Sequence, residues 1–235
     1  DDAGKGDSIG RLVEWLDPRG FRVHAPRRPS EDEALRPPGW RFWRRLPPRG
    51  AIAIFDRSWH SALLGARLSR ELDDAAFERE LERVRAFERQ LADDGALLVK
   101  FWLHVSKKEQ KRRLKDWARD PYQRWRAEEM KEAPTGDYDQ ALPVVETLLA
   151  RTHVAAAPWI PIEAEDDQYR RVRVLEETAG ALRGALAARA AGQPAAAPGG
   201  ERDAGPRPGG AASDAAPDVG PPPETAPAPH PDPLT

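Results

Sequence analysis

The sequence contains no cysteine and only one methionine among its 235 residues. Without cysteine the chain forms neither a disulfide framework nor a thiolate metal site. No stretch reaches the roughly 18 consecutive apolar residues of a membrane span. A formal net charge of −2 argues against an obligate nucleic-acid binder. These absences predict a cytoplasmic protein with neither nucleic acid nor a membrane as its partner.

Proline and aromatic residues are distributed unevenly along the chain. Twelve of the 24 prolines lie after Gln193, where no aromatic residue occurs, whereas all eight tryptophans lie within the first 190 residues. A segment of such composition buries too little apolar surface to offset the entropy lost on ordering. We therefore predict one domain over residues 1–190 and a disordered Ala/Pro/Gly-rich tail over residues 191–235.

Segments with strand character alternate with amphipathic segments over the first 190 residues. The predicted strands are residues 21–25, 51–56, 96–105 and 159–162. The predicted helices cover residues 40–46, about 77–91, 107 onward, 137–151 and 166–189, and residues 26–38 are predicted to form a charged loop. Such alternation predicts an α/β fold with three layers, α/β/α, in which helices cover both faces of a parallel sheet.

The first six residues, Asp1-Asp2-Ala3-Gly4-Lys5-Gly6, have the pattern of a phosphate-binding loop. They run into an amphipathic stretch that begins at Ile9. A Gly-Lys pair at a helix start aims backbone N–H groups and an ammonium at a phosphate chain. The first glycine of the loop and the strand leading into it are expected before residue 1. That truncated strand would be the central strand of the sheet.

Asp56-Arg57-Ser58 follows a run of small apolar residues at 51–55. An aspartate at the carboxyl end of a buried strand is where phosphate-transferring α/β proteins hold Mg²⁺ or the reacting oxygen. The loop at residues 1–6 and Asp56, in this order and separation, predict a P-loop kinase site.

Residues 107–126 carry a strong excess of positive charge, with nine cations against three carboxylates. The cations are Lys107, Lys108, Lys111, Arg112, Arg113, Lys115, Arg119, Arg124 and Arg126. The stretch follows a buried strand, at the edge where open α/β sheets bind ligands. We predict a basic helical lid over about 106–135 that closes on phosphates. A plain solvated helix face is the alternative.

Several longer motifs carry a family resemblance. They are Leu16-Asp17-Pro18-Arg19-Gly20-Phe21-Arg22-Val23, Trp40-Arg41-Phe42-Trp43-Arg44-Arg45-Leu46-Pro47, Phe55-Asp56-Arg57-Ser58-Trp59, Phe87-Glu88-Arg89-Gln90-Leu91, Lys100-Phe101-Trp102-Leu103-His104 and Ala157-Pro158-Trp159. With the loop at residues 1–6, they make the chain resemble the polyphosphate kinase type 2 family over about residues 1–185. The motifs are most similar to those of the amino-terminal half of the two-domain, AMP-phosphorylating branch.

The resemblance implies a P-loop enzyme that moves a phosphoryl group between inorganic polyphosphate and a nucleotide, AMP or ADP, with Mg²⁺. The implied catalytic residues are Asp1, Lys5, Asp56 and Arg57. The implied phosphate-binding residues are Gly4, Gly6, Arg67, Lys111, Arg112, Arg113, Lys115 and Arg124. Gly6 stands where other P-loops have a Mg²⁺-ligating Ser or Thr, so Asp1 and Asp56 are the expected metal ligands. A homo-oligomer is left open.

Two alternatives remain from the sequence. The family usually continues Asp-Arg-Ser-Trp with Tyr-Gly-Arg, where this chain has His60-Ser61-Ala62, and Ala66 replaces an acidic residue. A catalytically degenerate polyphosphate-binding domain of a tandem protein is therefore one alternative, and an ATP-dependent nucleotide kinase is the other. His60 is interpreted as a hydrogen-bonded replacement for tyrosine. Trp40 and Trp43 are interpreted as core residues.

Overall fold

The computed structural model describes residues 3–37 and 39–192. The strands are β1 (Phe21–His24), β2 (Ile52–Phe55), β3 (Lys100–His104) and β4 (Trp159–Glu163). The helices are α1 (Lys5–Val13), α2 (Glu31–Ala34), α3 (Trp40–Trp43), α4 (Trp59–Leu68), α5 (Asp74–Asp93), α6 (Lys107–Arg119), α7 (Arg124–Glu132), a 3₁₀ turn η1 (Pro134–Gly136), α8 (Tyr138–Thr152) and α9 (Asp167–Ala190). Asp1 and, from residue 193 onward, the predicted tail lie outside the described residues.

The strands pair in parallel, which confirms the predicted α/β class. β1 pairs with β2 from Phe21↔Ile52 to His24↔Phe55, and β3 pairs with β4 from Lys100↔Trp159 to His104↔Glu163. Within the described residues these pairs form separate two-stranded sheets. Because each pair is parallel, its carboxyl ends meet at one edge, where polar residues of neighbouring strands come together.

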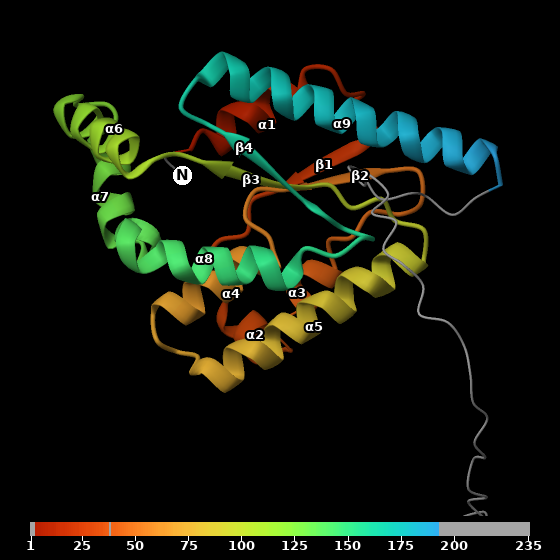
Figure 1. The fold of residues 1–235 in the computed structure, drawn as a ribbon, viewed down its shortest axis with the longest axis horizontal. Coiled ribbons are helices and arrows are strands. Elements are labelled where there is room, and N and C mark those ends of the chain that lie inside the picture. Colours follow the sequence, from red (N-terminus) through yellow and green to blue (C-terminus); the bar gives the residue numbers. More distant parts are fainter. Residues whose placement is uncertain (1–2, 38, 193–235) are drawn as a thin grey trace, which may run out of the picture. The chain divides into compact units, whose positions relative to one another are not determined.

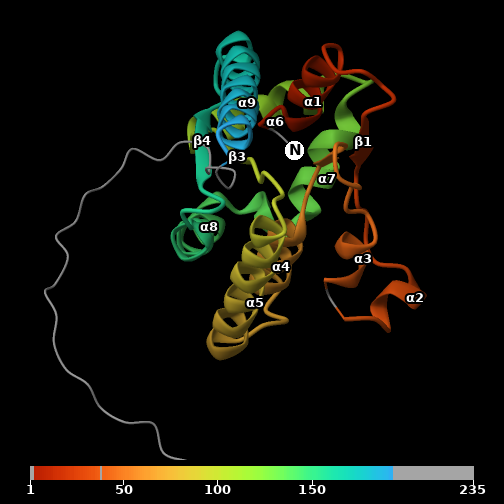
Figure 2. The ribbon, with the colours of Figure 1, turned by 90° about the vertical axis from the view of Figure 1, so that its right-hand side faces the viewer.

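Helices cover both sides of the strand layer, as the three-layer prediction requires. Figure 1 shows α1 and α9 on one side and α4, α5 and α8 on the other, and the rotated view in Figure 2 agrees. The α6–α7 pair stands at the end of this layer into which β3 runs (Figure 1). Among the described helices, none combines the length and apolar character that a membrane crossing needs.

The main hydrophobic core joins α4, α5 and α8. Its buried residues are Leu63, Leu64, Phe77, Leu81, Val145 and Leu148. Phe77 and Leu81 lie four positions apart, so they share one face of α5, and Leu81 is fully buried. The apolar periodicity of residues 77–91 thus predicted both the helix and the face that packs.

Two local expectations for residues 26–46 are wrong. The predicted charged loop contains the short helix α2, which begins with a capping box: Ser30 accepts from the Glu33 backbone while the Glu33 side chain accepts from the Ser30 N–H. Trp43 is 56% exposed, whereas Phe42 between the two tryptophans is 3% exposed. In a single turn of helix the face that packs depends on tertiary neighbours rather than on spacing.

Candidate active site

Gly4 and Lys5 form the start of α1, as the phosphate-loop pattern predicted. Gly4 is the N-cap in the left-handed region, with φ 80°. Its carbonyl accepts from the Ser8 backbone N–H at 3.0 Å and from the Ser8 hydroxyl at 3.1 Å. Lys5 is the first helical residue and is partly buried, and Gly6 follows it on the exposed side. This geometry presents the amino end of α1 and an ammonium together, the arrangement that favours an anion.

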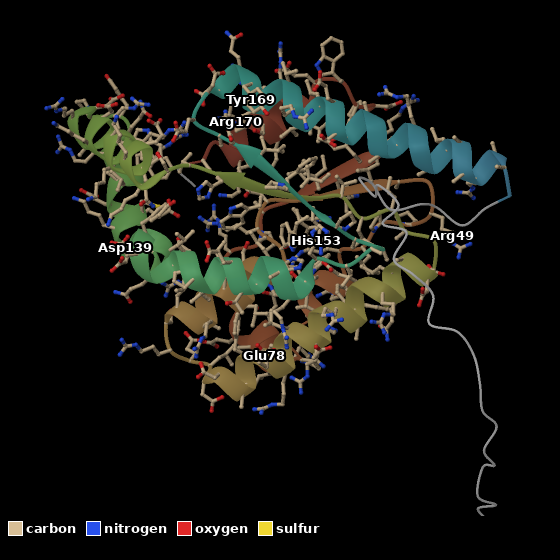
Figure 3. The ribbon with its side chains drawn as sticks, in the orientation of Figure 1. Arg49, Glu78, Asp139, His153, Tyr169 and Arg170 are labelled. Atoms are coloured by element: carbon tan, nitrogen blue, oxygen red, sulfur yellow. The ribbon has the colours of Figure 1, made fainter. Side chains whose placement is uncertain are left out.

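Arg170, from the first turn of α9, locks this helix start in place. It is 1% exposed and donates from Nε to the Ser8 hydroxyl at 3.0 Å. It also pairs with Asp7 and Asp167. Figure 3 labels Arg170 at the α9 end that lies over α1. No local pattern signals this arginine, because its partners in α1 lie more than 160 positions away.

Arg171 completes the clamp on Asp7. Its Nε and Nη2 donate to the two Asp7 oxygens at 2.7 and 2.8 Å. The hydrogen bond from Arg171 lowers the pKa of Asp7 below its usual value, and Arg170 adds to this effect. Asp7 is therefore held ionised beside the loop, where it is already satisfied by two guanidinium groups and anchors α1 to α9.

Asp56 lies at the carboxyl end of β2, as predicted. Its backbone N–H donates to the His24 carbonyl at 2.8 Å, which ties it to the end of β1. Its Oδ1 is buried and has no hydrogen-bond partner. A buried carboxylate oxygen without a donor is costly unless a cation or donor satisfies it. The Asp56 carboxylate therefore fits the hard oxygen ligand that Mg²⁺ prefers.

The described residues supply few further metal ligands. Over residues 3–37 and 39–192 there is no group of three or more His, Asp or Glu side chains arranged to hold a metal ion. Mg²⁺ in phosphoryl-transfer sites commonly takes one or two protein carboxylates and completes its shell with water and substrate phosphate oxygens. Asp56 alone meets that minimum. The second predicted ligand, Asp1, lies outside the described residues.

Arg57 has a strained backbone and faces the lid. Its φ is 69°, a left-handed conformation that costs a non-glycine residue roughly 1–3 kcal/mol. Its Nη2 lies 3.8 Å from Glu129 Oε1 on α7. The loop at residues 56–58 and α7 are therefore neighbours, and Arg57 stands between the end of β2 and the basic helices.

Ala3, directly before the Gly4-Lys5 helix start, lies at the carboxyl ends of β3 and β4. Ala3 is buried against Val105 and Ala164, which follow directly on the ends of these strands. In space, Ala3 lies beside the carboxyl ends of β3 and β4, and Asp56 directly follows the carboxyl end of β2. The predicted residues Gly4, Lys5, Gly6, Asp56 and Arg57 all stand at the carboxyl ends of parallel strands.

The predicted lid is a helical hairpin made of α6 and α7. Ser106 caps α6, and the helix ends at Arg119, just before Asp120-Pro121. Of the predicted phosphate-binding residues in the lid, the exposed ones are Lys111, Arg112, Lys115 and Arg124. Arg112 binds Glu109 and Asp116 along the helix at 2.6–2.8 Å. The hairpin therefore presents a cationic surface.

Arg113 differs from its neighbours in the lid. Its side chain is 11% exposed and donates to the Ala164 carbonyl at 2.7 Å and the Glu165 carbonyl at 3.0 Å, so it fastens α6 to the segment after β4. It also binds Glu109 at 2.6 Å. The Glu109 carboxylate accepts hydrogen bonds from both Arg112 and Arg113. The hydrogen bond from Arg112 is the main reason that the pKa of Glu109 falls to about 2.

Arg67 does not lie with the other predicted residues. It is the ninth residue of α4 and occupies the last turn of that helix, twelve positions after Phe55 at the end of β2. It donates to the Leu72 carbonyl at 2.8 Å, pairs with Asp74 and lies over the Phe77 ring at 5.6 Å. Its phosphate-binding role stays a prediction, while these contacts brace the turn between α4 and α5.

An arginine-lined cavity of about 440 Å³ lies beside the end of β1. Its lining includes His24, Glu33, Arg41 and Arg45. Glu33 lies 3.4 Å from Arg41 and 3.3 Å from Arg45, so its carboxylate offsets part of the positive charge. The His24 carbonyl accepts from the Asp56 backbone N–H, and His24 also lines the cavity. The cavity therefore adjoins the carboxyl end of β2 next to Asp56.

A buried polar cluster lies behind the loop at residues 56–58 and was missed as a functional feature. It consists of His60, Glu88 and Lys100, which are 4%, 0% and 7% exposed. Burial lowers the pKa of His60 and favours the neutral imidazole. The resemblance motifs contained Glu88 and Lys100, but nothing local indicated that the two side chains meet.

The fold is a three-layer α/β/α arrangement with charged residues at the carboxyl ends of its parallel strands, and comparison with known sequences identifies the family. The profile described as Polyphosphate kinase 2 (PPK2) matches residues 1–189. The chain belongs to the polyphosphate kinase 2 family.

Particular relatives agree with this assignment. A polyphosphate:AMP phosphotransferase of Pseudomonas aeruginosa is 42% identical over 198 residues, covering 83% of this chain and 40% of that protein. An AMP/ADP-polyphosphate phosphotransferase of Meiothermus ruber is 31% identical, covering 72% of this chain and 64% of that protein. The crystal structure of polyphosphate kinase 2 from Arthrobacter aurescens TC1 has a TM-score of 0.71 at 30% identity, covering 75% of this chain and 62% of that one. The chain spans about 40% of the length of the Pseudomonas relative.

Proposed function

We propose that this chain is a polyphosphate-dependent nucleotide kinase, which transfers a phosphoryl group between inorganic polyphosphate and AMP or ADP. The observations that carry the proposal are that the Gly4-Lys5 helix start follows Ala3 at the ends of β3 and β4, and that Arg57, after β2, lies beside Glu129 of the α6–α7 hairpin. The names of the Pseudomonas and Meiothermus relatives support polyphosphate as one substrate, with AMP slightly ahead of ADP as acceptor. A cytoplasmic location belongs to the same proposal.

The residues divide the work of the transfer. Lys5 and the amino end of α1 bind and neutralise phosphate oxygens. Arg57 stabilises the charge that develops on the transferred phosphoryl group. The exposed cations of α6 and α7 bind the rest of the polyphosphate. Asp56, with Asp1, would hold Mg²⁺, which when bound neutralises and orients the phosphates. Phosphoryl transfer asks mainly for positioning and charge neutralisation, so no dedicated nucleophile is required.

The test is a direct assay of nucleotide phosphorylation. The chain is incubated with Mg²⁺ and long-chain polyphosphate, with either AMP or ADP, and the nucleotides are separated by chromatography. Lys5→Ala and Asp56→Asn should each lower the rate by about a hundredfold or more, as loss of a preorganised charge does in other active sites. Full activity in both variants would contradict the residue assignment.

The same assay separates the two alternatives. Product formed with ATP but not with polyphosphate would identify an ATP-dependent nucleotide kinase. Salt-sensitive binding of polyphosphate without any nucleotide product would identify a degenerate binding domain, because bound lysines and arginines release counterions from a polyanion. The substituted segment His60-Ser61-Ala62 is the feature that motivates this second alternative.

A further inference from the structure

Three ionisable side chains lie in the core directly behind the Asp56–Ser58 loop. His60 comes from α4, Glu88 from α5 and Lys100 from β3. All three are at least nine-tenths buried. Burying charged groups is costly unless they are paired and hydrogen-bonded, so their partners are informative.

Glu88 is the centre of this cluster. Its Oε2 accepts from Lys100 Nζ at 2.7 Å, and Lys100 also donates to the Thr152 carbonyl at 2.8 Å. Its Oε1 accepts from Trp59 Nε1 at 3.2 Å and lies 3.1 Å from His60 Nε2. Both carboxylate oxygens are therefore engaged, and Lys100 holds the negative Glu88 carboxylate in a fixed position beside the imidazole.

The environment of His60 sets which of its nitrogens carries the proton. The His60 ring packs edge-on against Trp159 with centroids 4.7 Å apart, which fixes its plane. Nε2 makes no hydrogen bond, but the negative Glu88 oxygen 3.1 Å away favours the proton on that nitrogen. Nδ1 then has a free lone pair, and it lies 3.2 Å from the Ser58 hydroxyl, which donates to it.

The Ser58 side chain bonds His60 instead of capping the helix. It is the N-cap of α4, where a serine side chain ordinarily accepts from the helix backbone, yet it makes no such bond. On the other side of Arg57, the Asp56 N–H is bonded to the His24 carbonyl. Arg57, with its left-handed backbone, is thus held between one anchor at Asp56 and another at Ser58.

We propose that His60 is a positioning residue for phosphoryl transfer: backed by the Glu88–Lys100 pair, it fixes Ser58 and so keeps Arg57 in the conformation that faces α7. This inference rests on the proposed function. Packing alone would be met by an apolar ring at this position, because His60 sits among Trp59 and Trp159. What an apolar ring lacks is the Nδ1 acceptor for the Ser58 hydroxyl.

Two substitutions at residue 60 separate the acceptor from the packing. His60→Asn keeps an acceptor close to the position of Nδ1 but loses the ring, whereas His60→Phe keeps a ring and loses the acceptor. We expect His60→Phe and Ser58→Ala each to lower kcat roughly five- to tenfold with little change in KM, the size of one lost hydrogen bond. His60→Asn should retain more of kcat than His60→Phe. Ser61→Ala, on the exposed side of α4, is the matched control and should match the unsubstituted chain.

The double variant completes the test. If His60 acts through Ser58, the combined His60→Phe and Ser58→Ala variant should lose no more kcat than either single variant. Losses that multiply, or that follow the melting temperatures of the variants, would overturn the positioning role. So would equal kcat in His60→Asn and His60→Phe. An unsubstituted chain that forms no nucleotide product would instead refute the proposed function, and this inference with it.

Discussion

Gly4 and Arg170 lie so close that no side chain fits between them. A Cβ placed on Gly4 would come 2.3 Å from the guanidinium carbon of Arg170. Arg170 cannot retreat easily, because it is buried and bonded to Ser8, Asp7 and Asp167. The start of α1 is therefore shaped by a residue of α9.

Gly4→Ala should lower both the stability of the chain and the phosphotransferase activity proposed for it. The added methyl group would strain the left-handed backbone at φ 80° and displace the Arg170 guanidinium. Gly10→Ala is the matched control, since nothing lies within 4 Å of its Cβ position in α1. That control should be neutral or stabilising by about 0.5–1 kcal/mol, as expected for alanine in a helix. Thermal unfolding of both variants decides, and equal melting temperatures would contradict the clash.

Arg170→Met and Arg171→Met should differ although both arginines bind Asp7. Arg170 is buried, and its loss leaves Ser8 without its donor, so we expect a loss of about 2–3 kcal/mol in the free energy of unfolding. Arg171 has a side chain that is 37% exposed, and removal of such a surface pair costs about 1 kcal/mol or less. Urea denaturation measures both values. A larger loss for Arg171→Met would mean that the exposed pair is the main anchor of α1.

Glu109 predicts a specific acid sensitivity of the lid. Its pKa is about 2 in the folded chain against 4.5 for the free side chain, chiefly because Arg112 donates to it. A lowered folded pKa stabilises the folded state above the unfolded pKa, and this contribution disappears as the pH falls from 4.5 toward 2. Glu109→Gln should therefore be less stable than the unsubstituted chain at pH 7, with the difference shrinking below pH 4.5. A difference independent of pH would show that packing, not charge, is lost.

Substitutions of the exposed lysines and of Arg113 should have different effects: the first on the salt dependence of polyphosphate binding, the second on stability. Lys111 and Lys115 are exposed, so replacing both with glutamine should lower the salt slope of polyphosphate binding by about 1.4, by analogy with single-stranded nucleic acids. Arg113 is bonded to the Ala164 and Glu165 carbonyls, so Arg113→Met should chiefly lower the melting temperature. Binding isotherms at several salt concentrations, with melting curves beside them, test both halves. An unchanged slope in the double lysine variant would remove these lysines from the binding surface.

Much of the candidate site follows from local sequence. The Gly4-Lys5 helix start, Asp56 after an apolar strand, and the capped basic helix from Lys107 each rest on residues close together in the chain, so short-range rules predict them. The strand predicted over residues 96–105 is shorter in the structure, where β3 covers Lys100–His104. The residues between the Gly95 turn and Lys100 do not pair with β4. The helix α2 escaped prediction, although its Ser30–Glu33 capping box is visible in the sequence.

The sequence by itself determined the class of the protein, the alternation of strands and helices, and the residue types that we predict to bind phosphate. Only the tertiary structure decided that Arg170 braces the loop, that Arg113 belongs to the body rather than the ligand surface, and that His60 meets the Glu88–Lys100 pair. The physical reason is distance along the chain. Helix starts, caps and buried strands depend on neighbours within a few residues, whereas buried charges are fixed by partners that only folding brings together.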